Sequence, residues 1–97
     1  MIEIEIPLPD SAFPSRVPRI VESACDEAGL KLTLKSTLAT YPGCVHWHCQ
    51  RGKERGILEI TWWPAKRRLW FKVARNRRGE WIEKAVPQLK RKIESKL

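Results

Sequence analysis

The chain lacks the features that would point to a membrane or secreted protein. None of its apolar runs approaches the ~20 residues that a membrane-spanning helix needs. Its acidic start, MIEIEIPLPD, is unlike the basic and then apolar pattern of a signal peptide. Three cysteines, an odd number, do not suggest a disulfide framework and are typical of reduced thiols. We therefore expect a cytoplasmic protein with no membrane partner.

The sequence also lacks internal repeats, a low-complexity linker and a complete catalytic signature. Its 97 residues fit one compact domain, 1–97, with no room for a second. We predict that this domain is not an enzyme and holds no cofactor.

Acidic residues are scarce in most of the chain. Residues 1–29 have a formal net charge of −4, but residues 30–97 have a formal net charge of +12. The net charge is therefore +8, with a pI near 9.9. A basic domain favours polyanionic partners, of which nucleic acid is the first candidate.

Hydrophobic spacing predicts five strands and two helices. Isoleucines alternate with glutamates over 2–6, and leucines alternate with polar residues over 30–38. Helical spacing covers 15–28, with Ser15 as the expected N-cap, and again about 79–96. The stretch 44–74 contains three more strands joined by short loops.

These elements predict an α+β fold. Consecutive strands with short loops are antiparallel neighbours, and the apolar stripes of both helices need one common sheet face. The expected architecture is a two-layer sandwich, in the order strand, helix, four strands, helix, with both helices on one face.

This order resembles the TATA-binding-protein-like fold, in which a curved sheet carries two helices on one side. The resemblance covers nearly the whole chain and is one of topology, without a shared residue motif. It implies an open sheet face. Without the first strand, the order is closer to that of a double-stranded-RNA-binding domain.

Strand parity sorts the side chains of 44–74 onto two faces. The face toward the helices is expected to hold Val45, Trp47, Cys49, Leu58, Ile60, Trp62, Leu69, Phe71 and Val73. The outer face is expected to hold Cys44, His46, His48, Ile57, Glu59, Thr61, Trp63, Arg68, Trp70 and Lys72.

Symmetric closure of the hairpin loops predicts two rows of facing residues on the outer face. They are Lys35-His48-Glu59-Lys72 and Thr37-His46-Thr61-Trp70. An imidazole beside a carboxylate is typical of a general base, but a flat row more often holds cross-strand ion pairs. We therefore expect His48 to be a mildly perturbed surface histidine without a catalytic role.

Cys44, His46 and His48 share the outer face, and a His-x-His strand can converge on zinc. Cys49 points to the core and cannot join them. These three residues lie along one strand, and the sequence offers no second group of ligands to complete a site. We therefore predict no metal site.

Two features favour nucleic acid as the partner. Trp63 and Trp70, beside cationic side chains, could stack unpaired bases. The loop Arg75-Asn76-Arg77-Arg78-Gly79 precedes a helix whose free amides attract phosphate. The predicted interface comprises Lys31, Lys35, His46, His48, Trp63, Arg68, Trp70, Lys72, Arg75, Arg77 and Arg78.

The same tryptophans have other interpretations. An exposed Trp63/Trp70 patch could be a docking surface for a protein partner or a second copy of the chain. A cation–π pair with Arg68, or cover from the C-terminal helix or the segment after Pro7, would instead remove the tryptophans from solvent.

Overall fold

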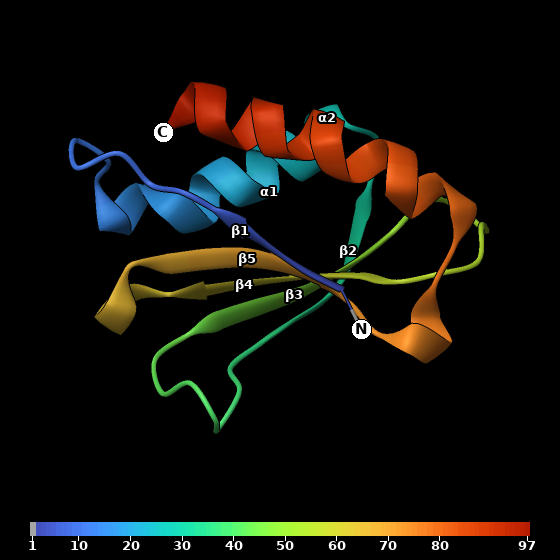
Figure 1. Cartoon of the computed structure of the whole chain (residues 1–97), viewed down its shortest axis with the longest axis horizontal. Coiled ribbons are helices and arrows are strands. Elements are labelled where there is room, and N and C mark those ends of the chain that lie inside the picture. The colour runs from blue at the N-terminus through green and yellow to red at the C-terminus, as the bar shows by residue number, and fades with distance from the viewer. Residues whose placement is uncertain (1) are drawn as a thin grey trace.

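The structure is a computed structural model that describes residues 2–97 (Figure 1). The strands are β1 (Ile2–Ile6), β2 (Lys31–Ser36), β3 (Val45–Gln50), β4 (Leu58–Trp63) and β5 (Arg68–Val73). The helices are α1 (Val17–Glu27) and α2 (Glu80–Lys96), and single 3-10 turns lie at Pro14–Arg16, Pro64–Lys66 and Arg75–Arg77. The predicted α+β class and element order are confirmed.

All five strands form one antiparallel sheet in the order β1-β5-β4-β3-β2. The first strand thus pairs with the last, and Ile4 lies opposite Phe71. β1 therefore forms one edge of the sheet, and β2 forms the other edge.

Both helices cover the same face of the sheet, as Figure 1 shows, and the core lies between the two layers. Trp47, Trp62 and Phe71 are fully buried there, as their parity predicted. The helices contribute Val17, Val21, Ala24 and Cys25 from α1 and Trp81, Ile82, Val86, Leu89 and Ile93 from α2. The opposite face, called the open face below, carries no helix.

The beginning of α1 differs from the prediction. Ser15 does not cap the helix, because it lies inside the turn Pro14–Arg16 and no side chain caps Val17–Glu27. A proline fixes φ near −65°, which suits a tight turn, and Arg16 there donates its amide to the Phe13 carbonyl at 3.0 Å.

A left-handed glycine follows the end of α1. Gly29 has φ +74°, a left-handed conformation that glycine adopts without strain. The Leu30 amide then folds back to donate to the Cys25 carbonyl at 2.9 Å.

Within residues 2–97, no helix is long and apolar enough to cross a membrane. All three cysteines are free. Cys25 and Cys49 are both buried, with their Sγ atoms 3.8 Å apart, and the hydrogen bond with Cys25 raises the pKa of Cys49.

Phe71→Ala is expected to lower the free energy of unfolding by about 3–5 kcal/mol, because the fully buried ring would leave a cavity between sheet and helices. Phe13→Ala is the matched control. Its ring is 64% exposed, so its loss should change the free energy by less than about 0.5 kcal/mol. Urea denaturation measures both values, and equal losses in the two variants would contradict the assigned core.

Candidate functional site

Two rows of facing side chains cross the open face. The first contains Leu34, His48, Glu59, Lys72 and Glu3. The second contains Ser36, His46, Thr61, Trp70 and Glu5. The predicted pairings across β3, β4 and β5 are all confirmed. Burial on the helix side enforces their parity, because a slip by one residue would expose a whole strand of core side chains.

The predicted position of Lys35 is wrong. A register irregularity in β2 just before Leu34 places that leucine, rather than Lys35, opposite His48. Such a bulge reverses the parity of the residues that follow it. Leu34 is consequently 42% exposed, while Lys35 faces the helices, with its Nζ 2.6 Å from a carboxylate oxygen of Glu22. Lys35 therefore takes no part in a site on the open face.

The same shift places Ser36, not Thr37, opposite His46. β2 ends at Ser36, so the strand does not extend to Leu38 as its spacing predicted. Instead the Leu38 amide donates to the Cys44 sulfur at 3.3 Å, and this buried thiol is not among the ligand atoms that gather around the two histidines.

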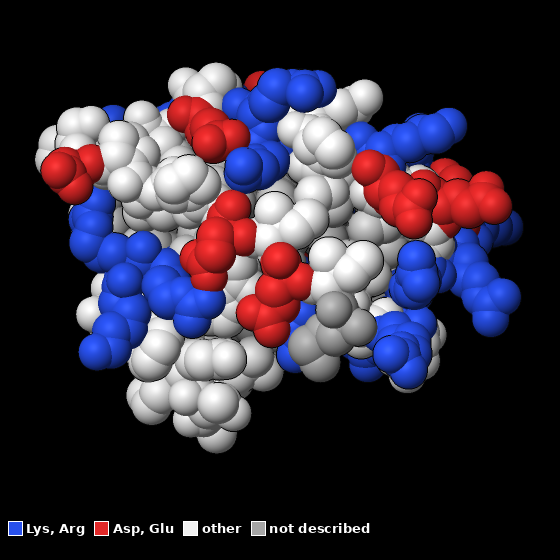
Figure 2. All heavy atoms as spheres, viewed as in Figure 1, with Lys and Arg blue, Asp and Glu red and all other residues white. Residues whose placement is uncertain are grey.

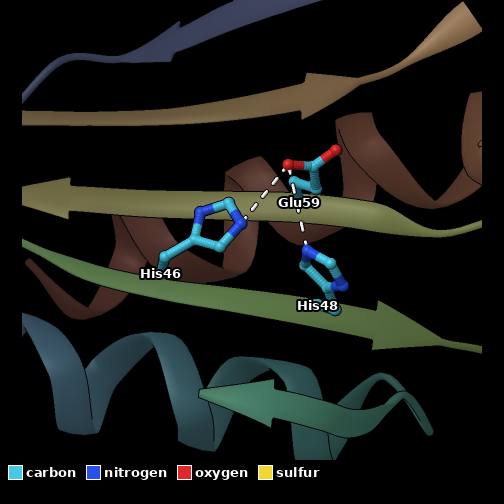
Figure 3. A group of neighbouring side chains, drawn as sticks. All are labelled: His46, His48 and Glu59. Atoms are coloured by element: carbon cyan, nitrogen blue, oxygen red, sulfur yellow. Dashed lines mark ion pairs between the residues drawn. The ribbon is translucent and has the colours of Figure 1, made fainter. Parts of the chain in front are cut away.

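The centre of the open face is a carboxylate between two imidazoles (Figure 3). Glu59 on β4 has its Oε1 3.3 Å from Nε2 of His46 and 3.9 Å from Nε2 of His48, both on β3. A guanidinium nitrogen of Arg77 lies 3.9 Å from Oε2 of Glu59 and 3.5 Å from Nε2 of His48. On the far side of the His46 ring, Nδ1 is 2.9 Å from the Thr61 hydroxyl. We call His46, His48, Glu59, Thr61 and Arg77 the polar cluster.

The partners of each ring nitrogen assign the tautomers. A carboxylate accepts hydrogen bonds only, so Nε2 of His46 carries a proton toward Glu59 and the Thr61 hydroxyl donates to Nδ1. A guanidinium donates only, so Nε2 of His48 accepts from Arg77 and its proton is on Nδ1. The two histidines are thus opposite tautomers.

Burial lowers the pKa of both imidazoles below the ordinary value of 6.5. The Glu59 carboxylate opposes this effect, and Arg77 adds to it. His46 is 3% exposed, so it is a buried residue rather than the surface residue that the sequence indicated.

Among the described residues, His46, His48 and Glu59 offer ligand atoms within 4.8 Å of one another. Cys44, which the sequence placed beside the histidines, is replaced in this group by Glu59. The cross-strand pairing of β3 and β4 brings this acidic residue to the two imidazoles.

The tryptophans of the open face are mostly covered. Trp70 is only 3% exposed, because the Tyr41 ring packs against its edge at 5.1 Å and the Arg68 guanidinium lies 4.5 Å above it. Trp63 is half-buried, and its indole N–H donates to the Pro42 carbonyl at 3.2 Å. The predicted exposed pair is therefore wrong, and the cover comes from the loop between β2 and β3, which lies at the bottom of Figure 1.

Two predicted cations on the open face lie beside acidic residues. Arg68 forms an ion pair with Glu5 of β1, and this hydrogen bond raises the pKa of Arg68. Lys72 lies between Glu3 and Glu59 in the first row. The two glutamates of the edge strand β1 thus offset much of the positive charge that the sequence indicated for this face.

Positive charge gathers instead at one end of the sheet, where two loops pack together. The Ile57 amide donates to the Arg77 carbonyl at 2.9 Å, and the Trp81 indole donates to the Arg55 carbonyl at 2.9 Å. A Cβ on Gly79 would lie 1.8 Å from the Arg55 carbonyl oxygen, so only glycine permits this approach. We call this end, with Arg51, Lys53, Arg55, Arg75, Arg77 and Arg78, the basic end.

The sequence identified the Arg75–Arg78 half of the basic end but not the half at 51–55. The signal that could have found it is the second basic run, in the hairpin RGKER. Lys31 lies at the same end of the sheet, opposite Gln50. The cover provided by Tyr41 could not be predicted from the sequence. The run YPG predicts a turn, but it does not show which side chain the tyrosine ring will contact.

Comparison with models of protein families, with curated proteins and with solved structures found no match to this chain.

The stability of the fold is expected to fall as pH decreases from about 6.5 toward 5. The unfolded chain takes up protons on its histidines near 6.5, whereas the folded chain binds them only at lower pH. Chemical denaturation at a series of pH values measures this slope. A His46→Gln variant should show a shallower slope, and an unchanged slope in that variant would contradict the assigned environment of His46.

Proposed function

We propose that this domain is a non-enzymatic binder of nucleic acid that contacts phosphate groups through its basic end. The observation that carries this proposal is the packing of two arginine-rich loops against each other. Backbone and indole hydrogen bonds of 2.9 Å join them, so six cationic side chains are presented together rather than on separate flexible turns.

Three of these cations have no acidic partner within 4.0 Å in the described part of the chain. They are Lys53, Arg55 and Arg75. Arg51 and Arg78 have exposed partners, Glu54 at 3.3 Å and Glu83 at 3.6 Å. Exposed ion pairs contribute about 0–1 kcal/mol, so a phosphate can displace the carboxylates.

The distribution of charge supports contact at one end rather than over the whole surface. In the view of Figure 2, acidic and basic groups are interspersed across the molecule. The lobe at the bottom of that view carries neither sign, in agreement with the uncharged loop 37–44. A flat sheet-wide interface for a polyanion would have to include Glu3, Glu5 and these neutral residues.

The mode of binding differs from the stacking that the sequence suggested. Trp70 is covered by Tyr41 and Arg68, so only Trp63 retains partial exposure for a base. We therefore propose that phosphate contacts dominate, which implies weak dependence on base sequence and strong dependence on salt.

The triple variant Lys53→Gln/Arg55→Gln/Arg75→Gln is expected to weaken binding of duplex DNA and to reduce its salt dependence. Each lost phosphate contact should lower the slope of log K against log salt by about 0.9. Fluorescence anisotropy with a labelled duplex and a labelled single strand, at two salt concentrations, measures affinity and slope.

The matched control is Lys90→Gln/Arg91→Gln/Lys92→Gln, which removes the same charge from α2 in the other layer of the molecule. It should retain most of the affinity. Equal weakening in both triple variants, or no binding by the natural sequence below ~0.1 mM at low salt, would contradict the proposal.

A second candidate function is association with a protein partner or a second copy of the chain. One observation favours it: Leu34 is 42% exposed on β2, an edge strand whose outer backbone groups could pair with another strand. Trp63 lies on the same face. Because Trp70 is buried, however, the exposed apolar patch is smaller than the sequence suggested.

We expect sedimentation at micromolar concentration to show a monomer, because lysines at both ends of the exposed part of β2 disfavour edge pairing. A dimer that dissociates in a Leu34→Glu variant would favour the second function instead. Leu32→Ala provides a control on the same strand, since this side chain faces the core.

A further inference from the structure

The contacts of Glu59 leave one part of the polar cluster unexplained by hydrogen bonding. Its Oε1 lies 3.9 Å from Nε2 of His48, beyond the 2.7–3.2 Å of an N–H···O bond. In the tautomer assigned above, both atoms are acceptors, so no hydrogen bond joins them, and the guanidinium of Arg77 is the cation that lies beside both residues. Nε2 of His46 lies 3.3 Å from the same Oε1 (Figure 3).

We propose that His46, His48 and Glu59 bind a divalent transition-metal ion. Two imidazoles and one carboxylate suit zinc and its borderline neighbours rather than calcium or magnesium. With metal–ligand bonds of about 2.0–2.2 Å, the ligands of a tetrahedral ion lie about 3.3–3.5 Å apart. The His46–Glu59 distance already has this value, the His48–Glu59 distance exceeds it by about 0.5 Å, and all three ligand atoms lie within 4.8 Å of one another.

The Thr61 hydroxyl supplies the outer support that a metal-bound histidine needs. It lies 2.9 Å from Nδ1 of His46, on the side of the ring away from the proposed ion. Such second-shell bonds set the ring orientation and the tautomer. On metal binding, the His46 proton moves from Nε2 to Nδ1, and Thr61 changes from donor to acceptor, so this ring releases no proton.

Arg77 is the competing cation. Its guanidinium approaches Nε2 of His48 at 3.5 Å and Oε2 of Glu59 at 3.9 Å, so it already balances the charge that the metal would bind. The Arg77 side chain is 39% exposed and can turn into solvent. Lys72, opposite Glu59 on β5, is the other nearby positive charge. The three protein ligands leave the fourth position of a tetrahedral ion open.

The test is calorimetric titration of the full chain with zinc chloride, without nucleic acid, together with the visible absorption of the cobalt(II) form. We expect one equivalent to bind. His48→Ala should lower the affinity by at least the 10–100-fold that loss of a second-shell group causes, and Thr61→Val should lower it by about 10–100-fold. Arg77→Gln should tighten binding, which a merely structural role of Arg77 would not predict.

Cys44→Ser is the matched control, because this thiol is held by the Leu38 amide and should not be a ligand. If replacement of the buried His46 prevents folding, the His48→Ala variant still tests the proposed site. The His48 side chain is 17% exposed, so we expect this variant to fold. Absence of zinc binding at micromolar concentration would overturn the proposal. Zinc binding that survives His48→Ala, or that is lost in Cys44→Ser, would overturn it too. Because no nucleic acid is present, none of these results depends on the proposed function.

Discussion

The carboxylate of Glu59 is the group on which the organisation of the open face depends. Its side chain is only 12% exposed, and a charge with so little solvent must be compensated by nearby donors or cations. The N–H of His46 and the guanidinium of Arg77 provide this compensation, and they come from β3 and from the loop after β5. This one charge is thus contacted by a ring on the neighbouring strand and by an arginine from the loop after β5.

The same contact links the polar cluster to the basic end. Arg77 reaches Glu59 with its guanidinium, while its backbone carbonyl accepts from Ile57, so the loop is fastened to the sheet at two points. The Trp81 indole donates to the Arg55 carbonyl, which lies against Gly79, and this hydrogen bond fastens the second basic loop to the start of α2. The cations at this end are therefore carried by loops that hydrogen bonds join to the sheet and to α2.

Much of the fold could be predicted from sequence because parity is enforced by burial. Trp47, Trp62 and Phe71 had to share the helix side, and the short hairpins then determined the pairing of His48 with Glu59. The bulge that moves Lys35 to the helix side has no signal in KLTLKS, where leucines alternate with polar residues as in a regular strand. The cover of Trp70 by Tyr41 and the packing of the two basic loops are tertiary contacts between segments distant in sequence, which periodicity does not report.

Glu59 and Arg77 between them determine which nitrogen of each histidine carries the proton, and imidazole nitrogen NMR measures this directly. In the metal-free protein near pH 7, long-range proton–nitrogen correlation spectra should show two neutral rings of opposite type. His46 should carry its proton on Nε2, toward Glu59, and His48 should carry its proton on Nδ1, with Nε2 accepting from Arg77. Two rings of the same tautomer, or two imidazolium rings at this pH, would contradict the account.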